Sequence, residues 1–266
     1  MVDYSRYEFI NVKKSGSVAI LLMNRPEKMN AFGNEEFLEV QRIFKDIDRD
    51  DEVKAAILTG AGRAFSAGGD IDNLIAVYKN PSLRLSMGNV KRLFQNLLAL
   101  RKPVVAALNG DATAAGATVA LCCDIVIAAE NARIGDTHIR VGLVPGDGSC
   151  AEWPLLVGMC KAKEYLMTGG LVSASEAERI GLINKAVPLE KLQEEAWKIA
   201  KGLADGPAQA ISWTKTCINK IILERINLIQ DASLAYMYHT TTMPDHLEAA
   251  EAFLEKRIPK FKGGPV

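Results

Sequence analysis

The stretch Pro103-Val-Val-Ala-Ala-Leu-Asn-Gly-Asp-Ala-Thr-Ala-Ala-Gly116 decides how this chain folds. Its apolar run, Val104 to Leu108, has the length and composition of a buried strand, and Asn109-Gly110 ends that run in a turn of very small residues. Such small side chains indicate that a ligand or another segment of the chain passes close to this backbone. The residues after Gly116 suit a buried helix, whose first turn carries unpaired N–H groups and the positive end of the helix dipole. We therefore expect an anion, or an oxygen that becomes one, to be stabilised here.

An earlier stretch has the same features. The run Ala55 to Gly60 predicts a second strand, and the glycine-rich turn Ser66-Ala-Gly-Gly-Asp-Ile71 follows it. Within this turn, Asp70 can cap the next helix. Each of the two turns offers a backbone N–H, and together the two groups are able to share one substrate oxygen.

Composition and charge restrict the class of protein. The chain has 266 residues, is 48% hydrophobic, and balances 32 basic against 32 acidic side chains. It can therefore bury a sizeable core in one large domain, or in a domain with an extension. A nucleic-acid binder would show a basic excess, and no apolar run approaches the ~20 residues that a membrane-spanning helix needs. Because the first residues also lack the apolar segment of a signal peptide, we expect a soluble cytoplasmic protein that binds neither nucleic acid nor membranes.

The cysteines and histidines indicate neither disulfides nor a metal site. Five cysteines without regular spacing are typical of reduced thiols, and we expect Cys122-Cys123 to pack in a core. His239 and His246 have no partner at metal-ligand spacing. We interpret both as packing or surface residues, and we expect no bound metal.

Outside the two turns, the pattern predicts ordinary elements. Residues 7–13 and 17–23 are expected to form a hairpin, residues 182–187 a strand, and residues 189–203 an amphipathic helix. Residues 208–255 are helical almost throughout, with a break at Met243-Pro244. Asp205-Gly206-Pro207 is the predicted boundary between a core of residues 1–205 and a C-terminal extension of residues 206–266.

Five phrases, in order and spread over nearly the whole chain, resemble the crotonase (enoyl-CoA hydratase/isomerase) superfamily. They are Asn24-Arg-Pro-Glu-Lys-Met-Asn-Ala31, Ser66-Ala-Gly-Gly-Asp-Ile71, Asn109-Gly110 with Ala115-Gly116, Cys123-Asp124-Ile125 and Val144-Pro-Gly146. The resemblance implies an α/β fold, a spiral of repeated β-β-α units with a C-terminal α-helical oligomerisation region. It also implies homotrimers that often pair into hexamers. The substrate would be an acyl-CoA, with no permanently bound cofactor, because coenzyme A enters as part of the thioester.

The same resemblance implies binding residues. The thioester oxygen would lie between the backbone N–H groups of Gly69 and Ala115. Contacts to coenzyme A are implied for Lys28, Ala31, Ala67, Gly69, Asp70, Ile71, Phe253 and Lys256. A lysine is a suitable point charge for a phosphate. For the Lys28 loop, an ordinary connection into a helix capped by Asn34 explains the sequence equally well, and solvated tail lysines are the alternative for Lys256.

Two positions depart from the family pattern. Hydratases of this family typically carry two glutamates that deliver water across the double bond. Counting from the flanking motifs, Thr118 and His138 stand at those two positions. Simple addition of water by two glutamates is therefore in doubt. Because a threonine hydroxyl is a poor base near neutral pH, a helix-core role explains Thr118 better than a catalytic one.

His138 is the stronger catalytic candidate, together with Asp147 nine positions later. The intervening segment, which ends in Val-Pro-Gly, should fold back on itself, so both side chains are expected to face one pocket. A carboxylate beside a histidine orients the ring and stabilises its charged form, which suits general base catalysis. For His138, the alternative is a hydrogen-bonded structural histidine. For Asp147, one alternative is a proton shuttle as in the dienoyl isomerases, and a plain Pro-Gly-Asp-Gly148 turn explains the residue about as well as function does.

The residues and the resemblance together predict an acyl-CoA-processing enzyme of the hydratase or isomerase type, which stabilises a thioester enolate. One alternative is hydrolytic cleavage of a carbon–carbon bond, because a histidine followed by Pro-Gly-Asp also resembles the β-diketone hydrolases. That branch has a second histidine where this chain has Ala115, and a glutamate without a clear counterpart near Met237. The other alternative is a non-catalytic CoA-binding or scaffold protein, although the two intact glycine turns favour a working ligand site.

Overall fold

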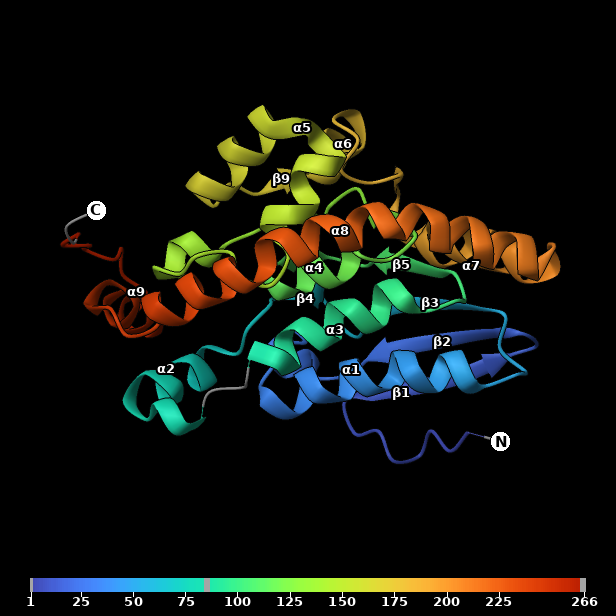
Figure 1. Ribbon diagram of the computed structural model, residues 1–266, viewed down its shortest axis with the longest axis horizontal. Coiled ribbons are helices and arrows are strands. Elements are labelled where there is room, and N and C mark those ends of the chain that lie inside the picture. Colours follow the sequence, from blue (N-terminus) through green and yellow to red (C-terminus); the bar gives the residue numbers. More distant parts are fainter. Residues whose placement is uncertain (1, 84–86, 264–266) are drawn as a thin grey trace.

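Two β-sheets and the helices around them build the molecule (Figure 1). The computed structural model describes residues 2–83 and 87–263. Within them, the larger sheet has six strands in the order β1-β2-β3-β5-β7-β10. β1 and β2 form an antiparallel hairpin, and all other neighbours in this sheet are parallel. Its strands are β1 Ile10–Ser15, β2 Val18–Met23, β3 Ala55–Gly60, β5 Val104–Leu108, β7 Ile125–Ala129 and β10 Lys185–Val187.

A smaller sheet in the order β4-β6-β8-β9 lies beyond the ends of the longer strands. Its strands are β4 Ala64–Ser66, β6 Asp111–Thr113, β8 Arg133–Gly135 and β9 Val172–Ser173. From β3 onward, a long strand, a short strand and a helix follow one another three times. The helices that close these units are α2 Ile71–Lys79, α4 Ala115–Leu121 and α5 Ser149–Thr168. This succession confirms the predicted spiral of β-β-α units.

The central strands β3 and β5 of the larger sheet are buried on both faces. On one face, α7 (Leu189–Asp205) contributes Leu192, Ala196 and Ala200, which pack among side chains of the central strands such as Val105. The other face supports a larger core that includes α1 (Asn34–Arg49) and α3 (Met87–Ala99). Because β5 is covered on both faces, a continuous apolar run is stable there, and all its residues are buried.

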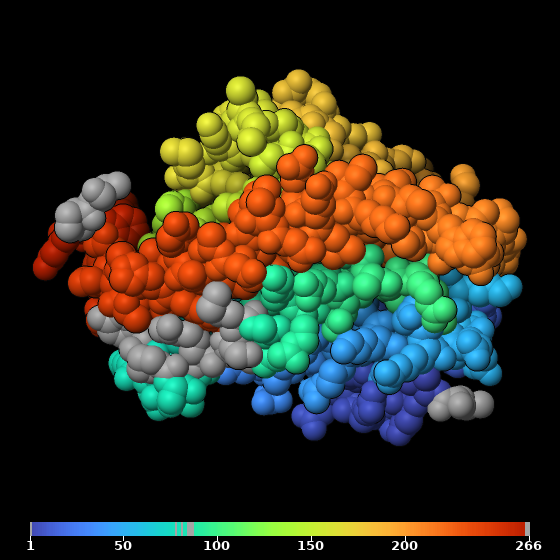
Figure 2. Space-filling model, viewed as in Figure 1, coloured from blue at the N-terminus to red at the C-terminus, as the bar shows by residue number. Residues whose placement is uncertain are grey.

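The C-terminal helices lie against this core. α8 (Ala208–Thr240) crosses the molecule between α5 and α3, and Figure 2 shows it as an orange band over this face. α9 (Pro244–Leu254) packs beside α2 and the one-turn helix η3 (His138–Val141). The break between α8 and α9 falls at Met243-Pro244 as predicted, because a proline at the first helical position has no N–H to leave unpaired. The other short helices are η1 Pro26–Lys28, η2 Pro81–Leu83 and α6 Ala174–Arg179.

Several predicted boundaries were wrong. The first strand of the hairpin, expected over residues 7–13, is β1 at Ile10–Ser15. The strand expected from residue 182 begins only at Lys185, because the N–H groups of Leu182 and Ile183 donate to the Ala177 carbonyl at the end of α6. α1 is capped by Gly33 rather than by Asn34.

Other predictions can be compared directly with the structure. Cys122 and Cys123 are buried, and every cysteine is a free thiol. His246 is buried, whereas His239 is exposed. Among the described residues, no helix has the length and apolar character needed to cross a membrane.

Candidate active site

The two glycine turns, far apart in the sequence, press against each other. A Cβ atom on Gly68 would lie 2.6 Å from the carbonyl oxygen of Thr113, and one on Gly116 would lie 2.6 Å from Cβ of Ser66. Such distances are far inside van der Waals contact. Only glycine allows the two backbones to approach so closely, and Gly68 also has φ +83°, which favours glycine.

Each turn leaves one backbone N–H without a partner. Phe32 pairs with the residues on either side of Gly69, because its N–H donates to Gly68 at 2.7 Å and its carbonyl accepts from Asp70 at 2.9 Å. The N–H of Gly69 itself points away from this pairing. Ala115 begins α4, so its N–H has no intrahelical acceptor. Among the described residues, neither N–H donates a hydrogen bond.

Ala114, directly before α4, has an unusual backbone conformation. Its φ and ψ are 47° and −126°, a region that costs a non-glycine residue about 1–3 kcal/mol. The hydrogen bond from its N–H to Gly135 holds this residue in place at 3.0 Å. The conformation turns the chain sharply into α4 and sets the direction of the Ala115 N–H.

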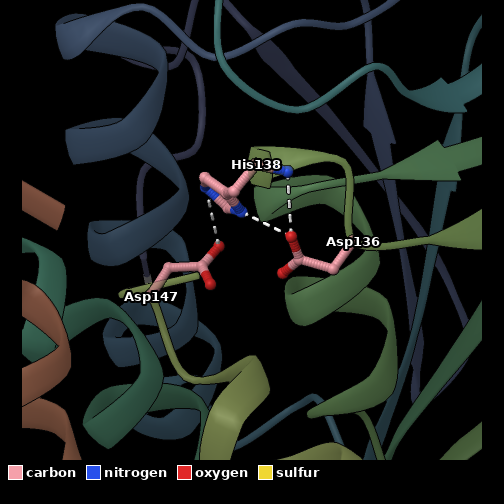
Figure 3. Close-up of side chains that lie close together, drawn as sticks. All are labelled: Asp136, His138 and Asp147. Carbon is pink, nitrogen blue, oxygen red and sulfur yellow. Dashed lines mark hydrogen bonds and ion pairs between the residues drawn. The ribbon is translucent and has the colours of Figure 1, made fainter. Parts of the chain in front are cut away.

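His138 opens η3 between two buried carboxyls (Figure 3). Asp136 Oδ1 accepts hydrogen bonds from His138 Nδ1 at 2.7 Å and from the His138 backbone N–H at 3.0 Å. On the opposite side of the ring, Nε2 lies 3.9 Å from Asp147 Oδ2. That gap is too long for a direct hydrogen bond. The Nε2 atom and the Asp147 carboxyl therefore face each other while remaining free to contact a third group.

Two hydroxyls connect these carboxyls to α4 and α5. Thr118 Oγ1 donates to Asp147 Oδ2 at 3.1 Å and lies 3.0 Å from Ser149 Oγ. Ser149 donates to Asp136 Oδ2. Thr118 is one helical turn after Ala115, and its N–H donates to the Ala114 carbonyl at 3.1 Å. The acid–base cluster is thus attached to the helix that starts with the free Ala115 N–H.

The charges of the cluster act on one another. Burial by itself lowers the pKa of His138, but the charges of Asp136 and Asp147 outweigh burial and raise that pKa to about 9. Burial favours protonation of Asp136 too, yet its contacts with His138 and Ser149 hold the pKa of this carboxyl below its usual range. For Asp147, burial dominates and raises the pKa. Near neutral pH, Asp136 is therefore the anion and His138, with a pKa of about 9, carries a proton, while the raised pKa of Asp147 makes that carboxyl the group with which the ring can exchange it.

These three side chains are also close enough to be considered as metal ligands, since one atom from each lies within 4.8 Å of the others. The Asp136 atom that faces His138 already accepts two hydrogen bonds from that residue. Asp147 Oδ2 accepts one from Thr118. We therefore interpret the group as a hydrogen-bonded acid–base cluster.

Comparison with known proteins identifies the family. The family model described as enoyl-CoA hydratase/isomerase matches residues 13–264. The chain belongs to the enoyl-CoA hydratase/isomerase family. As a member of this family, with named hydratases and isomerases as relatives, it is an enzyme of the enoyl-CoA hydratase/isomerase type.

Individual relatives of the family span the chain. A short-chain-enoyl-CoA hydratase from Clostridium acetobutylicum is 36% identical over 258 residues, which cover 94% of this chain and 97% of that protein. A 1,2-epoxyphenylacetyl-CoA isomerase from Escherichia coli is 34% identical, covering 96% and 99% of the two chains. The crystal structure of an enoyl-CoA hydratase/isomerase from Mycobacterium paratuberculosis superposes with a TM-score of 0.89 at 32% identity, covering 93% of this chain and 99% of that chain.

The residues that the family resemblance links to coenzyme A fall into two groups. The first lies on two adjacent segments joined by the Phe32–Gly69 bridge, and comprises Lys28, Ala31, Ala67, Gly69, Asp70 and Ile71. Lys28 is exposed and pairs with Asp72 at 2.5 Å, whereas Asp70 is buried, caps α2 and pairs with Arg25 at 3.1 Å. The second group, Phe253 and Lys256, is exposed around the end of α9. α9 packs beside α2 and η3 of its own chain, so Phe253 and Lys256 lie at the end of a helix that contacts the site elements directly.

Sequence reasoning missed two residues of this family member's cluster, Asp136 and Ser149. Asp136 stands two residues before His138, a spacing at which a carboxylate can accept from the backbone and ring of the same histidine. That local signal was available. Ser149 carried no signal, because a serine at the start of α5 resembles an ordinary first-turn residue until Asp136 is seen to lie against it.

Proposed function

We propose that this protein hydrates or isomerises an enoyl-CoA thioester, holding the thioester oxygen on the N–H groups of Gly69 and Ala115 and moving protons with His138 and Asp147. One observation carries the proposal. Asp147 accepts a hydrogen bond from Thr118, one turn after Ala115, and lies 3.9 Å from His138 Nε2. A carboxyl hydrogen-bonded to α4, and an imidazole next to that carboxyl, therefore accompany the helix that begins with one of the two free N–H groups.

The two N–H groups would stabilise the enolate. During the reaction, negative charge moves from the reacting carbons onto the thioester oxygen. Backbone donors held by the close contact of the turns need not reorganise as that charge develops. Removal of one such donor in other enzymes costs ~3 kcal/mol of transition-state stabilisation.

In water addition, His138 would accept one proton and Asp147 would donate one. In the form in which the proton lies on Asp147 and Nε2 is free, His138 Nε2 takes a proton from the water while the water oxygen bonds to Cβ, and the electrons of the double bond move to the thioester oxygen. Asp147, as a neutral acid, then gives its proton to Cα, and the enolate returns to the thioester. His138 now holds one proton more and Asp147 one fewer. One proton transfer between them restores the starting state.

Isomerisation needs only the proton transfers of this scheme. His138 and Asp147 would remove a proton from one carbon next to the double bond and return a proton to a different carbon of the same system. No water is consumed, so the reaction requires the same enolate and the same two acid–base groups.

A second candidate reaction is the hydrolytic cleavage of a carbon–carbon bond in a β-diketone or cyclic β-keto-CoA. The observation in its favour is the 2.7 Å contact between His138 Nδ1 and Asp136, because a ring held by a carboxylate at one nitrogen is arranged to activate water at the other. The water oxygen would add to the ketone carbon. His138 Nε2 would take one proton of that water. The electrons of the broken carbon–carbon bond would pass to the thioester oxygen of the β-keto-CoA, or to the second ketone oxygen of the β-diketone, held by the same two N–H groups. Asp147 would then protonate the leaving carbon, and transfer of a proton from His138 to Asp147 would restore the pair.

A mass-spectrometric screen tests these reactions. The purified protein is incubated with crotonyl-CoA, a longer enoyl-CoA and a cyclic β-keto-CoA, in ordinary water and in D₂O. Gain of water on the enoyl substrates supports hydration, deuterium incorporation without gain of water supports isomerisation, and ring opening of the ketone alone supports cleavage. His138→Gln should abolish the reaction, whereas His239→Gln, at an exposed site on α8, should not. The absence of all three signals would contradict the proposal, and coenzyme A binding without turnover would then favour the scaffold alternative.

We further propose that coenzyme A lies along the segments that carry Lys28, Ala31, Ala67, Asp70 and Ile71, with Phe253 and Lys256 of α9 as additional contacts. Lys28 already pairs with Asp72, so a coenzyme A phosphate would compete with that carboxylate. Oligomeric assembly belongs to the same proposal. α8 exposes large apolar side chains, including Trp213, Leu228 and Tyr236, which a homotrimer or a dimer of trimers would cover.

A further inference from the structure

A buried serine joins the two carboxyls of the site. Ser149 is fully buried at the start of α5. Its hydroxyl donates to Asp136 Oδ2, lies 3.3 Å from Asp147 Oδ1 and lies 3.0 Å from Thr118 Oγ1. The proton steps of hydration, isomerisation or cleavage do not use this hydroxyl.

Asp136 and Asp147 receive different numbers of hydrogen bonds from the groups around them. A serine hydroxyl has a single proton to donate. When Ser149 gives that proton to Asp136, this carboxylate has three donors, since His138 also donates through its backbone N–H and Nδ1. Asp147 then keeps Thr118 as its donor at 3.1 Å. Hydrogen bonds to a carboxylate favour its charged form, so the proton of the cluster rests with Asp147 and His138.

We propose that Ser149 is a positioning residue whose hydroxyl keeps Asp136 as the permanent anion behind His138 and thereby leaves Asp147 as the carboxyl that carries a proton to the substrate. The substrate part of this inference rests on the proposed function. The division of protons between the two carboxyls is a property of the free protein and can be measured without any substrate.

Other titratable groups surround the cluster. Glu152 and Cys150 lie on α5, and Cys122 follows α4. Burial raises the pKa of Glu152 to about 8. Burial also raises the pKa of each of the two thiols. All three are therefore mainly neutral near pH 7. From α9, His246 Nδ1 bonds to the carbonyl of Val141 at 2.6 Å.

The remaining neighbours of the cluster are uncharged or turned outward. On η3, the Arg140 side chain is exposed and packs against Gly169. α8 contributes the uncharged residues Gln230 and Ser233, which lie against the Asp147 loop. Among the described residues, the charge at the site near neutral pH is thus set by Asp136, His138 and Asp147.

The test is the titration of the His138 ring in the free protein, followed by NMR and assigned with His138→Gln. In Ser149→Ala, Asp136 loses a donor to its charged form, so the cluster should hold its proton to higher pH. We expect the apparent pKa of His138 to rise by about one pH unit, the size of one hydrogen bond to a charged group. Ser149→Thr keeps the hydroxyl and should restore the wild-type titration. Ser149→Cys, a weaker donor of similar size, should give an intermediate shift.

Ser173→Ala is the matched control. Ser173 caps α6 through its hydroxyl, so its loss affects a helix end without touching the cluster, and the His138 titration should not move. A folded Ser149→Ala protein in which His138 titrates as in wild type would overturn the proposal. So would a uniform loss of turnover at every pH with no shift of the profile, because that result indicates packing alone. If the wild type turns over none of the substrates, the proposed function falls, while the titration still decides the role of Ser149.

Discussion

His138 is held by a carboxylate that lies only two residues before it. Asp136 accepts hydrogen bonds from the backbone and from the ring of His138, so a local turn sets the orientation of the imidazole. The more distant Asp147 lies 3.9 Å from the other ring nitrogen, and in the proposed mechanism it exchanges a proton with the ring. In the proposed mechanism, the chemistry depends on one proton exchanged between His138 and Asp147 beside the Asp136 anion.

The first prediction concerns the pH dependence of turnover. With a pKa of His138 near 9, the His138–Asp147 pair keeps its shared proton at neutral pH and loses it above about 9. Because that proton is the one delivered to Cα, kcat/KM should be level around neutrality and fall about tenfold per pH unit above 9. A pH–rate profile measures this. A kcat/KM that instead climbs from pH 7 to 9 would show that His138 works as a base without a protonated Asp147.

The second prediction concerns Glu152, which is buried behind the site on α5. Apart from the Cys122 thiol, its carboxyl meets no hydrogen-bonding group among the described residues. Burial raises its pKa to about 8 from 4.5, so between these values the folded protein binds a proton that the unfolded chain releases. The free energy of unfolding should therefore fall as pH rises through this window, by at most about 1.4 kcal/mol per pH unit.

Glu152→Gln removes this contribution while keeping the size of the side chain. His138 also weakens the fold as pH rises, because the proton that it binds more tightly in the folded state is lost between about 6.5 and 9. The informative quantity is therefore the difference between the two proteins in urea unfolding at pH 6 and pH 9. Between pH 6 and pH 9, the free energy of unfolding of the variant should fall by roughly 2–4 kcal/mol less than that of wild type. Equal losses would mean that Glu152 is not held as a neutral acid.

At the scale of elements, the site depends on how closely two strand–turn–helix units approach. β3-β4-α2 provides Gly69 and β5-β6-α4 provides Ala115, and parallel pairing of β4 with β6 sets the two turns side by side. Gly68 and Gly116 are the points of contact. A change in either glycine should move both N–H donors relative to each other.

The third prediction follows for Gly116→Ala. The added methyl would meet Ser66 at 2.6–2.7 Å, so the turns must separate. We expect a loss of about 1–3 kcal/mol in the free energy of unfolding, the usual cost of overpacking, and at least tenfold lower turnover. Thermal unfolding and kcat on the confirmed substrate measure the two effects.

Gly202→Ala is the control for that variant. Gly202 lies within α7 and a Cβ there meets nothing within 4 Å, so alanine should stabilise the helix by about 0.5–1 kcal/mol and leave turnover unchanged. A Gly116→Ala protein that behaves like Gly202→Ala would show that the close approach of the turns is not required.

At the scale of the whole molecule, the C-terminal helices support the segment that carries His138 and Asp147. On α8, Gln230 donates to the carbonyl of Asp147 at 3.1 Å, while on α9 His246 bonds to Val141 at the end of η3. The outward side of α8 is unusually apolar, with Trp213 64% and Leu228 72% exposed. Such side chains are typical of surfaces that another protein chain covers.

The fourth prediction is therefore a homo-oligomer. Light scattering after size-exclusion chromatography should give three or six times the chain mass of 28.9 kDa. Introducing two charges by Trp213→Glu with Leu228→Glu should reduce that mass, because burial of unpaired charges opposes association. Lys45→Glu, at an exposed position on α1, serves as the control and should not. A wild-type monomer would contradict the assembly proposal.

The predicted division of the chain at residue 206 stays a prediction. The gap between α7 and α8 falls at Gly206-Pro207, where the proline cannot continue α7. α8 nevertheless packs on α3 and α5. Whether residues 1–205 fold alone is a question for a truncated chain.

Sequence patterns alone predicted the N-terminal hairpin, the strands β3 and β5, the two glycine turns, the C-terminal helices and the family. They did not predict β7 or the short strands β4, β6, β8 and β9. The predicted features depend on local regularities: apolar runs such as 104–108, caps such as Asp70, and prolines such as Pro244 act on neighbouring residues. The pattern also singled out His138 and Asp147, because both lie close to recognisable family phrases. Boundaries such as the start of β10 were missed because the chain there pairs with α6 instead of continuing the strand.

The contacts around the proton that His138 and Asp147 exchange in the proposed mechanism depend on the tertiary structure. Ser149 approaches Asp136, and Thr118 approaches Asp147, because α4 and α5 pack together, and hydroxyls at the starts of two helices carry no mark of that contact in the sequence. The raised pKa of Asp147 likewise comes mainly from burial, which depends on everything packed around it. Local patterns therefore specify the elements, whereas the electrostatics of the site arise from contacts between residues that are distant in the chain.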